Sequence, residues 1–93
     1  MNVTIANLVT PHLLKVVDLA KQAETGGNVE WHVRDTVGRT IDALGHQYNA
    51  RDLLTSYVQG LETAAKENGR IYSAYSRTLQ AAADQAARHL ERL

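Results

Sequence analysis

The sequence of 93 residues contains no cysteine, and it has a single proline and a single tryptophan. The absence of cysteine excludes disulfides and every metal site that uses thiolate ligands. No stretch approaches the roughly 20 consecutive apolar residues that cross a bilayer. No basic run precedes the apolar part of the N-terminal segment, as it would in a cleaved signal peptide. We therefore expect a soluble cytoplasmic protein without a membrane contact, and export that needs no signal peptide stays open.

Neither sign of charge is in excess, because ten Lys and Arg residues balance ten Asp and Glu residues. Nucleic-acid-binding proteins usually carry a basic excess, since neutralising phosphates supplies most of their non-specific affinity. The charge balance therefore disfavours a nucleic-acid partner. A small nucleic-acid-associated regulator remains the alternative interpretation, and its contacts would be Arg34, Arg39, Arg51, Arg70 and Arg77.

Motifs for catalysis are also missing. The sequence has no G-x-S-x-G, no glycine-rich phosphate loop and no paired-carboxylate pattern. His32 and Asp35 are three residues apart and can face the same way on a helix, but a zinc site needs three or four ligands. We expect no enzyme activity, no metal site and no cofactor.

Helical signals run along most of the chain. Thr10-Pro11 is typical of a helix start, because threonine caps well and proline is favoured in the first turn. Gly26-Gly27 is typical of a helix end. A chain of this length forms one domain. The sequence therefore predicts a single helical domain over 1–93, with an N-terminal arm over 1–10 and helices over 11–25, 28–45 and 49–93.

The last of these segments carries an unbroken heptad seam from Leu54 to Leu93, whose positions recur every three or four residues and are apolar except for Asn68 and His89. The seam passes through Asn68-Gly69, which otherwise resembles a helix C-terminus. One interpretation is a single helix about 65 Å long, and the other is two helices split at Gly69. The unbroken phase favours the continuous helix. Both interpretations give an all-α fold, a small helical bundle with an N-terminal helical hairpin.

A continuous last helix would leave its second half without cover from the rest of the chain. An exposed apolar surface of that size marks an interaction site, and its alanines would let a partner helix approach closely. Trp31 lies opposite the apolar face of its helix, where it either contacts a partner or folds back over the Gly26-Gly27 turn. The predicted partner-binding residues are Trp31, Gly38, Tyr72, Tyr75, Leu79, Ala82, Ala83, Ala86 and Leu90.

These features predict a non-enzymatic protein–protein interaction module, such as an adaptor, an inhibitor or a secretion-type partner protein. It would associate through its C-terminal coiled-coil seam, either as a homodimer or with another helical protein. A short chain buries only about 60–65% of its unfolded surface, so association would also add stability.

The chain resembles the WXG family of small helical proteins that type VII (ESX) systems secrete. The resemblance rests on size, on the lack of cysteine and of a signal peptide, on heptads, on a Trp near a turn, and on Tyr72 and Tyr75 late in the chain. Trp31-His32-Val33 lacks the glycine of the family's motif. Ser76 and Leu79 stand four residues after the two tyrosines, where the family's export signal has an acidic residue. The resemblance implies export and assigns no functional residue.

Overall fold

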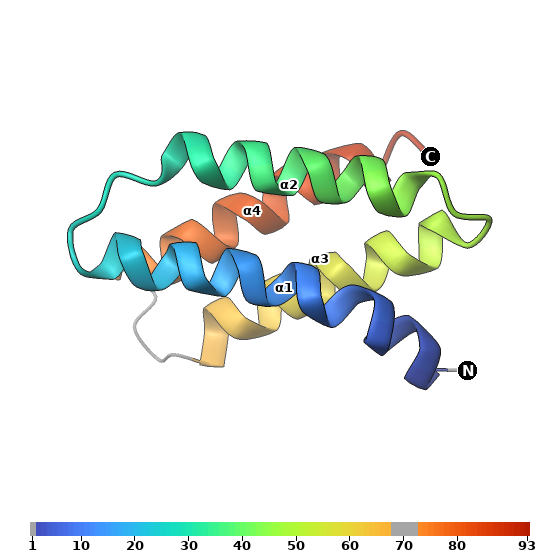
Figure 1. Ribbon diagram of the computed structural model, residues 1–93, viewed down its shortest axis with the longest axis horizontal. Helices are drawn as coiled ribbons and strands as arrows, with labels where there is room; N and C mark the ends of the chain where they lie inside the picture. Colours follow the sequence, from blue (N-terminus) through green and yellow to red (C-terminus); the bar gives the residue numbers. More distant parts are fainter. Residues whose placement is uncertain (1, 68–72) are drawn as a thin grey trace.

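The computed structural model describes residues 2–67 and 73–93. Over these residues the chain forms α1 (Asn2–Glu24), α2 (Glu30–Gly45), α3 (Ala50–Glu67) and α4 (Ala74–Leu90), with no strand. Successive helices run in opposite directions, so α1 and α3 point one way and α2 and α4 the other (Figure 1). The predicted fold class, an all-α small helical bundle, is confirmed. No described helix has the length and apolar character needed to cross a membrane.

The centre of the bundle is built by the apolar face of α3. Leu53, Leu54, Tyr57 and Leu61 of this helix are completely buried, and their spacing of three and four residues places them along one side. The other three helices all contact α3. The radius of gyration is 12.6 Å, close to the value of about 12 Å expected for a compact chain of this length. The chain therefore covers its own core.

The heptad seam is divided between two helices. α3 ends at Glu67 and α4 begins at Ala74, and the buried Ser76 hydroxyl donates a hydrogen bond to the Ala65 carbonyl at 3.0 Å. In one straight helix these two residues would be about 16 Å apart. The favoured prediction of a continuous helix over 49–93 is therefore wrong, and the alternative with two helices is correct. Gly69, the predicted point of division, lies outside the described residues.

The unbroken heptad phase does not predict a continuous helix, because the phase indicates only which face of a helix is buried. Two separate helices can carry the same phase. Local capping sets the start of α4. The Ser73 side chain accepts a hydrogen bond from the Ser76 N–H at 3.1 Å, and the Glu24 carboxylate accepts one from the Tyr75 N–H at 2.9 Å. A cap of this kind stabilises a helix by about 1 kcal/mol.

The predicted N-terminal arm over 1–10 is also wrong, because α1 begins at Asn2 and continues through Pro11. A proline inside a helix removes one backbone hydrogen bond and costs about 3 kcal/mol. Burial of Val9 and packing of Ile5 against the core offset this cost. The first turns of α1 are inclined to the rest of the helix (Figure 1), as expected where a proline interrupts the hydrogen bonds.

The remaining helix boundaries follow the sequence signals closely. α1 ends at Glu24, and Gly26 adopts a φ of 98°, the left-handed conformation that favours glycine. The predicted helix over 28–45 corresponds to α2, whose N-cap residue is Val29. The N-terminal helical hairpin is therefore present, with a longer first helix than expected.

Replacing Leu79 with alanine should lower the free energy of unfolding by about 2–4 kcal/mol, because a completely buried leucine leaves a cavity when it is truncated. Leu14→Ala is the matched control, since Leu14 is 57% exposed, and it should change the stability by less than about 0.5 kcal/mol. Urea unfolding followed by circular dichroism measures both. Equal losses in the two variants would contradict this packing.

Candidate functional site

Four of the predicted partner-binding residues lie inside the bundle. Leu79, Ala82, Ala83 and Ala86 are at most 1% exposed, because α1, α2 and α3 all pack against α4. The prediction that these residues bind a partner assumed that nothing in the chain covers α4. That assumption is wrong, and in the folded chain these four side chains are not accessible to a partner.

Three further residues of the predicted set belong to α4 or its flank. Tyr75 and Leu90 are partly buried and pack against the core. Tyr72 lies outside the described residues. The α4 part of the predicted site therefore serves mainly to hold the bundle together.

The two predicted residues on α2 lie on the surface. Trp31 is 70% exposed, so it points outward and does not fold back over the glycine turn. Its ring meets the His32 ring edge to face, with centroids 5.6 Å apart. Gly38 lies two turns further along the helix and is partly exposed, and a Cβ atom there would meet nothing within 4 Å. Among the described residues, no close contact requires a glycine at position 38.

A groove of about 420 Å³ runs between α2 and α4 beside Trp31. We call it the α2–α4 groove. Glu30, Val33 and Arg34 of α2 line the groove, and the exposed Trp31, which follows Glu30 in the sequence, is not one of its lining residues. The lining residues are Ala23, Gly27, Asn28, Val29, Glu30, Val33, Arg34, Ala74, Arg77, Thr78, Ala81, Gln85 and Arg88.

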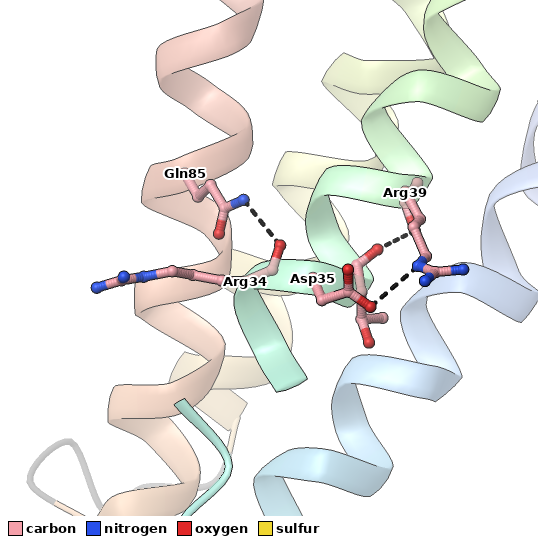
Figure 2. Close-up of polar contacts among 6 residues, drawn as sticks. Arg34, Asp35, Arg39 and Gln85 are labelled. Atoms are coloured by element: carbon pink, nitrogen blue, oxygen red, sulfur yellow. Dashed lines mark hydrogen bonds and ion pairs between the residues drawn. The ribbon is translucent and has the colours of Figure 1, made fainter. Parts of the chain in front are cut away.

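The two walls of the groove are joined by a hydrogen bond from the Gln85 side chain to the Arg34 carbonyl at 3.2 Å (Figure 2). The Arg34 guanidinium pairs with Glu30 at 3.1 Å. Figure 2 shows the Arg34 side chain extending to the side of α4, whereas the Asp35–Arg39 pair, at 2.9 Å, lies to its other side. Gln85 thus fixes the spacing of the walls and leaves the arginine side chain at the mouth of the groove.

Polar groups also meet inside the bundle, where α1, α2 and α3 come together. The Thr40 hydroxyl donates to the Thr36 carbonyl at 3.0 Å and lies 3.4 Å from His12 Nδ1. The Tyr57 hydroxyl is buried and has no hydrogen-bond partner among the described residues. Burial raises the pKa of Tyr57 to about 12, and the nearby Thr40 hydroxyl offsets part of this increase. Burial, and then the charge of Lys15, lowers the pKa of His12.

This internal cluster lies apart from the α2–α4 groove. None of its side chains lines the α2–α4 groove, so the groove does not bring a ligand against them. Across residues 2–67 and 73–93, no three His, Asp or Glu side chains lie close enough together to hold a metal ion. The groove and the exposed Trp31 on the same helix are therefore the strongest candidate for a functional surface.

The sequence interpretation missed the α4 wall of the groove. Arg77, Ala81, Gln85 and Arg88 follow one another at intervals of four, four and three, so helical periodicity could have shown that they share a face. It could not have shown that α2 lies alongside that face, because the pairing of helices depends on tertiary packing.

Comparisons with protein-family models, with curated proteins and with solved structures found no match to this chain.

Replacing Tyr57 with phenylalanine should leave the protein as stable as before or more stable by up to about 1 kcal/mol, because it removes a buried hydroxyl without a partner. Above about pH 10 the wild type should lose stability relative to the variant. The unfolded tyrosine ionises near its ordinary pKa of 10.0, whereas the folded one resists ionisation up to about 12.

Urea unfolding at neutral and at alkaline pH measures this difference, with Tyr48→Phe as the control because Tyr48 is fully exposed. A loss of more than about 1 kcal/mol in Tyr57→Phe at neutral pH would show that the hydroxyl has a hydrogen-bond partner.

Proposed function

We propose that this chain is a non-enzymatic protein–protein interaction module, an adaptor, inhibitor or secretion-type partner, that binds through the outer surface of α2 and α4. The observation that carries the proposal is the exposure of Trp31, the sole tryptophan, on α2 next to Glu30, which lines the α2–α4 groove. Tryptophan is enriched among the residues that dominate binding energy. A groove beside such a residue gives a partner side chain a place to insert.

Both parts of this surface are needed for the proposal. Single exposed apolar residues are common on protein surfaces and by themselves indicate nothing. Trp31 differs from the fully exposed Tyr48 because a groove lined in part by the accessible alanines Ala23, Ala74 and Ala81 lies near it. A partner that covers Trp31 can therefore also bury apolar surface in the groove.

The partner is a second copy of the chain or a different helical protein. Binding does not expose the buried residues of the heptad seam. The resemblance to WXG-type proteins extends the proposal to synthesis in the cytoplasm followed by export without a cleaved signal. No step of the proposal uses a cofactor.

A photoreactive phenylalanine analogue at position 31 should form an adduct of defined mass in cells that produce the protein naturally. The same analogue at position 48 is the matched control, because Tyr48 is an aromatic residue that is fully exposed away from the groove. Excess wild-type protein should compete for the adduct, and the Trp31→Ala variant should compete poorly. An adduct twice the mass of the chain identifies a homodimer.

Equal adducts at both positions, or no adduct at position 31, would contradict a binding surface around Trp31.

Gly38→Ala should stabilise the free protein by about 0.5–1 kcal/mol, because alanine is the better helix former and a Cβ atom meets nothing there. If the partner contacts α2 beside Trp31, the same substitution should weaken competition for the position-31 adduct. Urea unfolding measures the first effect and adduct competition the second. A variant that is more stable and competes as well as wild type would exclude Gly38 from the interface.

A further inference from the structure

Pro11 divides α1 into two parts, and the part after the proline is held firmly by the rest of the bundle. Val16 and Ala20 are completely buried. Leu13 is partly buried and packs against the core, and it approaches α3 so closely that a Cβ atom at Gly60 would lie 2.7 Å from Leu13 Cδ1. The helix is therefore anchored to its neighbours from the first turn after the proline onward.

The part of α1 before the proline is held by fewer contacts. Of the side chains over residues 5–10, Val9 is buried, Ile5 is partly buried and the other four are exposed. A groove of about 370 Å³, which we call the α1–α3 groove, lies between these turns and α3. Its walls include Ala6, Val9 and Thr10 from α1, and Ser56, Gly60 and Thr63 from α3. Contact between the first turns of α1 and α3 is therefore incomplete.

The same residues have little helical tendency of their own. Pro11 has no N–H group, so it cannot donate the helical hydrogen bond to the Asn7 carbonyl. Five of the nine residues from 2 to 10 are β-branched, and such residues favour helices less than most. The first turn has no acidic residue to interact with the partial positive charge of a helix N-terminus. Because isolated helices shorter than about 12–15 residues are marginal in water, residues 2–10 depend on their packing against α3 to stay helical.

We propose that residues 2–10 form a hinged flap that undocks from α3 about Pro11 while the rest of the bundle stays folded. Undocking exposes Val9 and makes the α3 wall of the α1–α3 groove accessible. Segments with few buried apolar contacts open locally at a smaller free-energy cost than the whole protein unfolds. The flap is a conformational device of the fold that does not involve the α2–α4 groove, so its failure would leave the proposed function unaffected.

Two buried valines on α1, one on each side of Pro11, provide a matched test. Val9 is 1% and Val16 is 0% exposed, and the chain has no native cysteine. Val9→Cys and Val16→Cys therefore each introduce a single buried thiol. A thiol-reactive dye should label Val9→Cys at least about a hundredfold faster than Val16→Cys, because undocking exposes only the first thiol and needs no global unfolding. Circular dichroism checks that both variants fold.

Two further measurements identify the motion that exposes position 9. Low concentrations of urea should accelerate labelling of Val16→Cys and leave that of Val9→Cys nearly unchanged, because undocking exposes far less surface than global unfolding. Adding Pro11→Ala to Val9→Cys restores the backbone N–H and should slow labelling about tenfold or more. Adding Gly38→Ala is the control, because Gly38 lies on α2, which stays folded when the flap undocks. It should leave the labelling rate of Val9→Cys unchanged.

Hydrogen exchange of the wild type makes the same comparison without a substitution. The amide hydrogens of residues 6–10 should exchange at least about a hundredfold faster than those of residues 17–20, and more slowly than in an unstructured peptide. Equal labelling rates of the two cysteine variants, equal exchange of the two sets of amides, or no slowing by Pro11→Ala would each overturn the proposal. Unprotected amides over residues 6–10 would also overturn it, because the flap would then not dock.

Discussion

The alanine-rich face of α4 has to be covered, and the rest of the bundle is arranged around that requirement. Leu79, Ala82, Ala83 and Ala86 are nearly inaccessible to solvent. Because alanine buries little area of its own, this face is stabilised only if several helices approach closely. Polar contacts among the described residues tie α4 to the other helices: to α3 from Ser76, to α1 through Glu24 and to α2 from Gln85. These contacts fix the position of α4 where side-chain volume alone would allow it to slide.

The same arrangement determines what the chain offers to a partner. Once the seam is internal, the surface of α2 and α4 retains the groove, the arginines and Trp31. The hydrogen bond from Gln85 to the Arg34 carbonyl belongs both to the packing of the bundle and to the groove wall (Figure 2). Stability and binding are therefore coupled through α4. Variants that test binding have to be chosen on the solvent side, since changes on the buried side would unfold the wall itself.

The sequence was sufficient to predict which faces of the helices are buried. Val33, Val37, Ile41 and Leu44 form one buried side of α2, as their spacing indicates. Connectivity could not be predicted in this way, because α3 and α4 show the same heptad phase whether they are joined or folded back. The contribution of tertiary packing to helix length also could not be predicted from the sequence. Local preferences place a helix start at Pro11, yet α1 begins at Asn2, because burial of Val9 stabilises the turns before the proline.

The candidate site was predictable only in part, for a related reason. Trp31 could be predicted as a surface residue because it lies opposite the buried face of its helix, and the periodicity of that one helix is enough to show this. The groove needs two helices that are distant in sequence, and no local pattern joins Arg34 to Gln85. The alanines of α4 do not by themselves distinguish a docking surface from a buried face, because small residues favour close approach equally well within a chain and between chains.

The most direct test of this account is the distance between residues 51 and 88 in solution, measured by pulsed electron resonance on nitroxide labels. The chain has no native cysteine, so Arg51→Cys together with Arg88→Cys places labels at two exposed sites only. The bundle predicts a distance below its longest dimension of 38 Å, unchanged when labelled chains are diluted with unlabelled ones. A distance of about 56 Å, the span of a continuous helix, or a short distance that disappears on dilution, would contradict a core that each chain covers for itself.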